Sequence, residues 1–295
     1  MHPASLENLR ELGRQLDANV YPRVLNDGIV ALSDPGVGVL SLSAEKCNER
    51  QRENRPAAGS RQGPAGRQRP ANRSRSPRTA APFVSERLRQ EYLGQLDAVM
   101  AAYPRTTVWK RREGLWLFVE SSVLAELDRR ATFLVALPFV ENALPKAWGF
   151  WATPLSWSWI GPRHTNFGCG SICAFEPSDQ VWLPGESIVS LLDFYTLWAL
   201  RHLHLEIERR WPGQQWVPFA FERIEELDDD DFCGCSEPKG RYAQCCKQAD
   251  LAADKNTIAL EFLQATKFQT RQAPERIIKF LNERDNPPGF LDDLI

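Results

Sequence analysis

The sequence predicts an α+β fold in which one helix precedes an antiparallel β-meander and a long helix follows it. Residues Ser85 to Ala102 carry apolar side chains at three- and four-residue intervals, the spacing of one helix face. Three β-leaning runs come next, separated by charged turns such as 111–114. A second apolar stripe starts at Ser187 and runs to Arg210, where Trp211-Pro212-Gly213 ends the helix.

Length and composition set the limits of this prediction. With 295 residues and 43% hydrophobic content, the chain can form one large or two modest domains around a buried core. A formal net charge of −2 gives no reason to expect nucleic acid or membrane as a partner. No apolar run is long enough to span a bilayer, and the first residues do not resemble a secretory signal. We therefore expect a cytoplasmic protein whose cysteines are thiols or metal ligands.

The first 82 residues divide into two predicted parts. Segment 1–47 has a helical pattern at Leu6 to Leu16 and short strand patterns from Gly28 to Leu42, and we assign it no role. Segment 48–82 has nine arginines, two glutamates and almost no apolar residue, so burial cannot offset its ordering entropy. We expect a mobile basic linker. Non-specific nucleic-acid contact is the alternative, but no aromatic residues are interleaved for base stacking.

The main domain is predicted over residues 83–222. Its β-leaning runs are Thr106 to Arg111, Leu115 to Val123 and Thr132 to Val140. Beyond Pro145 the chain becomes rich in tryptophan and phenylalanine, and we interpret it as irregular through Gly161-Pro162. Packing is the expected role of these rings, which are Trp148, Phe150, Trp151, Trp157 and Trp159.

A short motif lies between the predicted strands and the long helix. It contains His164-Thr165-Asn166, then Gly170-Ser171-Ile172-Cys173, then Trp182-Leu183-Pro184, and prolines at 138 and 145 precede it. This order resembles the active-site segment of ubiquitin-conjugating enzymes, in which a His-Pro-Asn triplet precedes the nucleophilic cysteine and a Trp-x-Pro precedes a helix. The resemblance implies a ubiquitin-conjugating-type fold with an N-terminal helix, a β-meander, an active-site loop and helices.

The motif departs from the eukaryotic pattern in three ways. Thr165 stands in place of the proline, the interval from His164 to Cys173 is about one residue shorter, and the aromatic approach at 148–159 is longer. Such divergence is similar to that of the bacterial relatives encoded in antiphage operons, including cyclic-oligonucleotide-based (CBASS-type) systems. That resemblance implies a cGAS-like nucleotidyltransferase as a partner.

The resemblance also implies the chemistry. Cys173 would receive a ubiquitin-like modifier, or the C-terminus of a partner protein, from the thioester of an activating enzyme and pass it to an amine. We find no glycine loop for ATP, and this transfer needs none. Asn166 is our candidate for stabilising the oxyanion. His164 is a candidate general base, although the corresponding histidine of the family is mainly structural, and we favour that role. Cys169 is either a second thiol or a small space-filling residue.

A second cysteine group lies further along the chain. Cys233-x-Cys235, nine residues and Cys245-Cys246 supply four soft ligands, enough for a tetrahedral Zn²⁺ site. With 240–242 they resemble the SEC-C metal-binding motif, although Gly234 replaces its proline and the spacer is about one residue longer. We expect structural zinc within a module at 223–250; disulfides and redox-active thiols are the alternatives. We interpret the acidic run Asp228 to Asp231 as a solvated hinge and the module as a docking site for substrate or partner.

The tail, 251–295, is predicted to be helical, with two helices between Asn256 and Glu283 divided near Ala273-Pro274. It would cap the domain or bind a partner. Three functions remain open at this point: a thioester-forming transferase, a non-catalytic interaction scaffold of the same fold, and a cysteine hydrolase that uses Cys173 and His164. In the fourth alternative the segment has no functional role and is a glycine-bearing loop with two inert thiols in an aromatic core.

Overall fold

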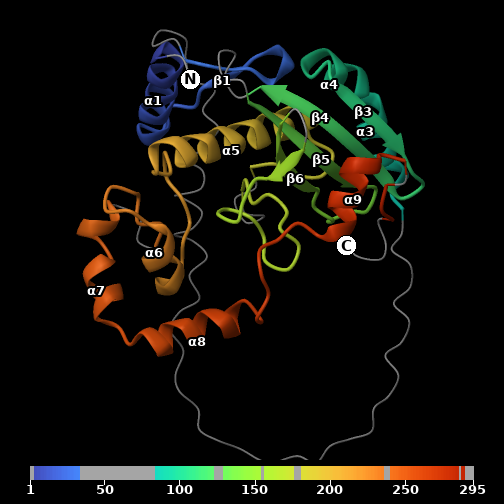
Figure 1. Ribbon diagram of the computed structural model, residues 1–295. Helices are drawn as coiled ribbons and strands as arrows, with labels where there is room; N and C mark the ends of the chain where they lie inside the picture. The colour runs from blue at the N-terminus through green and yellow to red at the C-terminus, as the bar shows by residue number, and fades with distance from the viewer. Residues whose placement is uncertain are drawn as a thin grey trace, which may run out of the picture.

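A computed structural model describes residues 3–33, 84–122, 129–153, 156–175, 181–235, 240–285 and 287–289. The predicted α+β class is confirmed: helices cover both faces of one antiparallel sheet, and a separate small helical unit stands beside it (Figure 1). The predicted linker, 48–82, and the strand pattern beyond Ser33 lie outside the described residues. No helix in the described part of the chain is long and apolar enough to cross a membrane.

The sheet is a meander in which each strand pairs with the next. In the described ranges its order is β3 (Thr106–Lys110), β4 (Gly114–Ser122), β5 (Arg130–Pro138), β6 (Lys146–Ala152) and β7 (Trp157–Trp159). The register pairs Leu117 with Val135 and Leu134 with Trp148. The three predicted strands are confirmed. Our interpretation of the aromatic stretch as irregular is wrong, because 146–152 and 157–159 form the last two strands of the sheet.

The first face of the sheet carries the helices α3 (Glu86–Gly94), α4 (Leu96–Ala102) and α5 (Ile188–Glu208). Their apolar side chains share one core with Leu117, Phe133 and Val135. The single helix predicted from Ser85 to Ala102 is two helices, which meet at Gln95. The side chain of Gln95 ties this junction to the start of α5: it accepts a hydrogen bond from the amide of Ile188 at 2.7 Å and donates to the carbonyl of Glu186.

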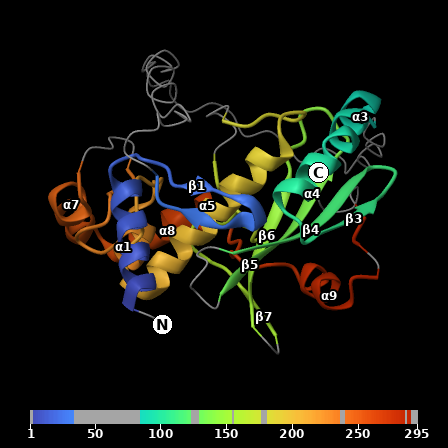
Figure 2. The ribbon, with the colours of Figure 1, turned by 90° about the horizontal axis from the view of Figure 1, so that it is seen from above.

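The second face of the sheet is covered by α9 (Glu275–Glu283), on the side opposite α3 and α4 (Figure 2). The ring of Phe280 packs edge-on against Trp116 at 5.3 Å, and Trp116 stacks on Trp148 at 6.1 Å. Alternate residues of β4, β5 and β6 therefore face two different cores. The division of the tail near Ala273-Pro274 is confirmed, since α8 (Lys255–Ala265) ends before it and α9 begins directly after it.

Residues 3–33 belong to the main core although a long segment separates them from it in sequence. Helix α1 (Pro3–Asp17) packs against α5, and its Leu9, Leu12 and Leu16 are buried there. The short strands β1 (Arg23–Val24) and β2 (Val30–Ala31) flank a 3₁₀ turn, η1 (Asn26–Gly28), which contacts β4. We predicted the helix in this segment but not its position on α5.

A smaller unit follows α5. It consists of α6 (Ala220–Glu226), the cysteine segment, the 3₁₀ turn η3 (Tyr242–Gln244) and α7 (Lys247–Ala252). Arg223 of α6 forms two hydrogen bonds with Asp250 of α7, at 2.8 and 2.7 Å, and both side chains are buried. Such a bidentate, buried pair fixes the two helices relative to each other because breaking it would leave a buried charge unpaired.

Candidate functional site

The motif that holds Cys173 is a tight hairpin between β7 and α5. The amide of Cys173 donates to the carbonyl of His164 at 3.0 Å, and the amide of Asn166 donates to the carbonyl of Ser171 at 2.8 Å. Thr165 and Ile172 form an antiparallel β-bridge between these two backbone hydrogen bonds. Gly170 permits the turn: its φ is +58°, and a Cβ there would lie 2.3 Å from the carbonyl carbon of Gln272.

The hairpin contributes His164, Asn166 and Cys173 to the lining of one pocket of about 210 Å³. Thr165 is buried and also lines this pocket, whereas Ile172 is buried and does not line it. The remaining lining side chains come from the hairpin, the segment after α5, α6 and the tail: Phe167, Trp216, Val217, Pro218, Phe219, Glu222, Glu226 and Arg271. The three site residues named from the motif therefore meet at the same pocket, with Cys173 half-buried in its wall.

The side chain of Asn166 lies at the exposed edge of this hairpin. Its amide nitrogen donates to the hydroxyl of Ser171 at 3.0 Å and, more weakly, to the carbonyl of Ile172 at 3.3 Å. Both acceptors directly precede Cys173 in sequence. The amide therefore braces the backbone that carries the thiol, and Asn166 lines the same pocket as Cys173.

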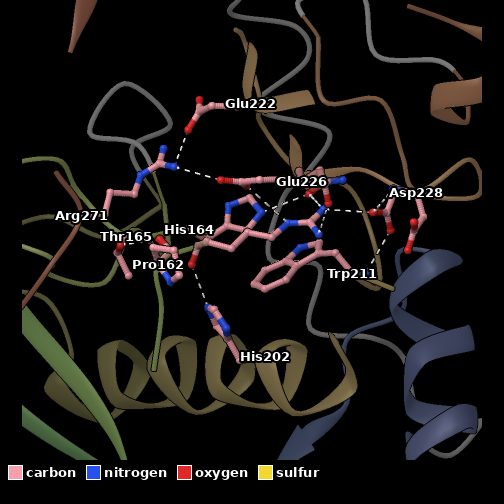
Figure 3. A network of polar contacts seen from close by, with 12 residues as sticks. Pro162, His164, Thr165, His202, Trp211, Glu222, Glu226, Asp228 and Arg271 are labelled. Carbon is pink, nitrogen blue, oxygen red and sulfur yellow. Dashed lines mark hydrogen bonds and ion pairs between the residues drawn. The ribbon is translucent and has the colours of Figure 1, made fainter. Parts of the chain in front are cut away.

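The surroundings of His164 fit a structural role better than proton transfer. Its Nε2 lies 3.1 Å from Oε1 of Gln215, and its ring lies 4.1 Å from that of Trp211 (Figure 3). Its carbonyl accepts a hydrogen bond from the indole of Trp198 at 2.9 Å. Burial, helped by the neighbouring charge of Arg163, holds the pKa of His164 well below its usual range. The imidazole is thus neutral and anchored.

Cys169 does not line the pocket. Its sulfur lies 3.2 Å from the Ser171 hydroxyl, and its carbonyl accepts a hydrogen bond from the indole of Trp148 at 2.8 Å. These contacts fix the turn of the hairpin. They support the assignment of Cys173, rather than Cys169, as the thiol that faces the pocket.

The motif gave no indication of the charged wall of the pocket. Arg271 forms ion pairs with Glu222 and Glu226, and its guanidinium lies 3.9 Å from the centre of the Phe167 ring (Figure 3). Burial raises the pKa of Glu226, and the nearby Glu222 adds to this while Arg271 opposes it. These residues lie far from Cys173 in sequence and have no spacing signal, so inspection of the chain could not find them.

The buried histidines beneath the hairpin make stability depend on pH. Burial lowers the pKa of His202 to about 3, and its Nε2 lies 2.9 Å from the carbonyl of Arg163. An unfolded histidine has a pKa of about 6.5, so the unfolded chain binds more protons between these values. The stabilisation from neutral His202 is complete above about pH 6.5 and is lost as the pH falls toward the folded value, by about 1.4 kcal/mol per pH unit.

We therefore expect the free energy of unfolding, measured with urea, to fall between pH 7.5 and 5.5, and to fall less steeply in His202→Gln. Glutamine keeps an N–H donor but does not titrate. The other histidines and metal release are common to both proteins, so the difference in slope reports His202 together with its electrostatic coupling to His164. Equal slopes would contradict a neutral, buried His202.

Four cysteines converge in the small unit after α5. The Sγ atoms of Cys233, Cys235, Cys245 and Cys246 all lie within 4.8 Å of one another. The Sγ atoms of Cys235 and Cys245 are 3.6 Å apart, and those of Cys245 and Cys246 are 3.8 Å apart. Zn–S bonds of about 2.3 Å at tetrahedral angles place sulfurs about 3.8 Å apart. The cluster is therefore compatible with a structural zinc ion, and four thiolates match the closed ligand set of such sites.

The backbone around the cluster is held by its own turns. The amide of Cys233 donates to the carbonyl of Gly240 at 3.1 Å, and the amide of Cys245 donates to that of Tyr242 at 3.1 Å. Burial and the neighbouring thiols raise the pKa of Cys245 to about 11. A divalent cation would offset the charge of the four thiolates that metal ligation requires.

The acidic run, which we interpreted as a solvated hinge, is exposed only at Asp228, Asp229 and Asp230. Asp231 is fully buried. Its carboxylate accepts hydrogen bonds from Arg163 at 3.1 Å, from the amide of Trp211 at 3.0 Å and from the amide of Asp228 at 3.2 Å. A carboxylate loses solvation on burial, and these three donors compensate for that loss.

No protein-family model matches this chain, and neither a curated protein nor a solved structure matches it.

Proposed function

We propose that this protein is a ubiquitin-conjugating-like acyltransferase that carries a ubiquitin-like modifier, or the C-terminus of a partner protein, as a thioester on Cys173. The observation that supports it best is the hairpin. Cys173, Asn166 and His164 line one pocket, and the hairpin lies between an antiparallel meander and a long helix. This is the order of elements in the family that the motif resembles.

The chemistry assigns one role to each residue. The Cys173 thiolate attacks the carbonyl of a thioester on an activating enzyme; a new C–S bond forms as the donor C–S bond breaks and the donor leaves as a thiolate. An amine of the acceptor then attacks the Cys173 thioester and the Asn166 amide stabilises the oxyanion. A C–N bond forms, the C–S bond to Cys173 breaks, and the proton lost by the amine passes through solvent to the departing thiolate. His164 keeps the hairpin in place through Trp198, Trp211 and Gln215.

Structural zinc on Cys233, Cys235, Cys245 and Cys246 belongs to this proposal. When bound, the zinc ion would hold the small unit folded. A setting in bacterial antiphage defence, with a cGAS-like nucleotidyltransferase as a partner, follows only from the resemblance of the motif. The hydrolase alternative is weaker, because the pKa of His164 is depressed and its Nε2 is engaged by Gln215. Among the described residues this leaves no free, basic imidazole beside Cys173.

Intact mass spectrometry of the protein isolated from its native host tests this function. Wild type is expected to carry an adduct that reductant removes, Cys173→Ser a reductant-resistant ester, and Cys173→Ala none. Cys169→Ser is the matched control and should keep the labile adduct. If wild type shows the bare chain mass while its partners are present, the interaction scaffold becomes the better assignment.

A further inference from the structure

The wall of the pocket opposite the hairpin is tied to the cysteine cluster by backbone. The amide of Val217, a lining residue, donates to the carbonyl of Gly234 at 2.7 Å, and Gly234 lies between Cys233 and Cys235. The approach is so close that a Cβ on Gly234 would lie 2.8 Å from the Val217 nitrogen, and φ there is +70°. Only glycine fits these constraints without strain. The contact gives a structural reason for glycine at this position.

A second connection joins the cluster to the hairpin itself. Arg163, directly before His164, is 6% exposed and donates to Asp231, to the Gln215 side chain and to the carbonyl of Glu226. The Asp231 carbonyl in turn accepts the amide of Tyr242, between the two pairs of cysteines. One of the three partners of the guanidinium, Asp231, thus lies beside the cluster, and the other two lie in the chain that leads to it, at 215 and at the end of α6.

Gln215 closes the network. Its Oε1 accepts a hydrogen bond from Arg163 at 2.8 Å and lies 3.1 Å from Nε2 of His164. Its Nε2 donates at 2.7 Å to the carbonyl of Phe232, the residue before Cys233. One side chain therefore contacts both the hairpin of Cys173 and the backbone of the first metal ligand.

We infer that the cysteine cluster supports the Cys173 pocket structurally. Metal binding to the cluster keeps the hairpin conformationally ordered, and the positioning residues Asp231 and Gln215 connect the two. This assigns the cluster a role different from a separate docking module. The importance of the hairpin rests on the proposed function, but the coupling itself does not. Loss of the ion would free the segment at 231–235, and Arg163 would then lose its fully buried carboxylate partner, Asp231, beneath His164.

Hydrogen–deuterium exchange on the full chain tests the coupling, with the protein loaded with Zn²⁺ alone or stripped by a chelator. Stripping is expected to speed exchange about tenfold at 163–173 as well as at 231–246, while the paired strands β4 and β5 keep their protection. Faster exchange at 231–246 alone would overturn the inference. So would an equal rise in β4 and β5, because that indicates global unfolding.

Substitutions separate coupling from metal binding itself. In Asp231→Asn, exchange at 163–173 should rise while the zinc content stays that of wild type; Asp230→Asn, an exposed neighbour, is the matched control and should change neither. Gln215→Met, which keeps the length of the side chain, gives a second test if Asp231→Asn does not fold. Wild-type exchange at 163–173 in both variants would overturn the inference. A failure of Cys173 to form an adduct would bear on the proposed function and leave this result unaffected.

Discussion

Replacing Cys233 with serine is expected to remove bound zinc and to unfold the small unit that carries the cluster. Cys233 is the buried member of the four, and serine supplies a poor ligand in the same volume. Structural Zn²⁺ in small cysteine sites contributes about 10–16 kcal/mol of apparent binding free energy. That unit has only a small apolar core, made by Val217, Leu227, Cys233 and Tyr242, which cannot replace a contribution of this size.

The measurement is metal content by mass spectrometry together with circular dichroism during thermal unfolding. Wild type should hold one zinc ion per chain, and Cys233→Ser should hold none and lose an early, chelator-sensitive transition. Cys169→Ser controls for removal of a thiol as such, since Cys169 lies outside the cluster. Wild type that takes up no zinc, even when refolded with it, would contradict the metal assignment and favour the redox or disulfide alternatives.

The elements that the sequence predicts are those whose polar and apolar residues form a clear pattern within one short segment. Strands β3 to β5 are separated by charged turns, and α5 has a continuous apolar stripe, so both were found. Strand β6 is missed because both of its faces are buried, with Ala147 and Trp151 in one core and Trp148 and Phe150 in the other, and because no charged turn separates it from β7. Strand β7 is missed because it has only three residues. A strand buried on both faces shows no alternation of polar and apolar residues.

The same distinction applies to the site. Cys173, Asn166 and His164 lie within ten positions, so a short motif identified them together. Glu222, Glu226 and Arg271 reach the pocket only through tertiary packing. Asp231 resembles its exposed acidic neighbours in sequence, and its burial depends on Arg163, 68 positions earlier. Single-sequence patterns cannot report such a pairing, because neither residue has an unusual local context.

Asn166→Ala is expected to slow transfer from the Cys173 thioester to an amine by about 10²–10³-fold while leaving formation of that thioester within a few-fold of wild type. The reason is geometric. Asn166 lines the same pocket as Cys173, and the bond of its amide to the carbonyl of Ile172 is long, at 3.3 Å. One N–H can thus turn to a developing oxyanion with little loss. Removal of one preorganised donor typically costs about 2.7–4 kcal/mol in the transition state.

A purely structural role for Asn166 predicts a different result. The amide also donates to the Ser171 hydroxyl at 3.0 Å, so Ser171→Ala removes the shorter of its two bracing bonds and leaves the amide in place. If Asn166 acts on the oxyanion, Ser171→Ala should retain most of the transfer rate, measured as single-turnover discharge to free lysine. If bracing is its only function, both variants should slow loading and discharge alike. Measuring thioester formation and discharge separately therefore shows whether Asn166 acts in catalysis or only holds the hairpin that carries the thiol.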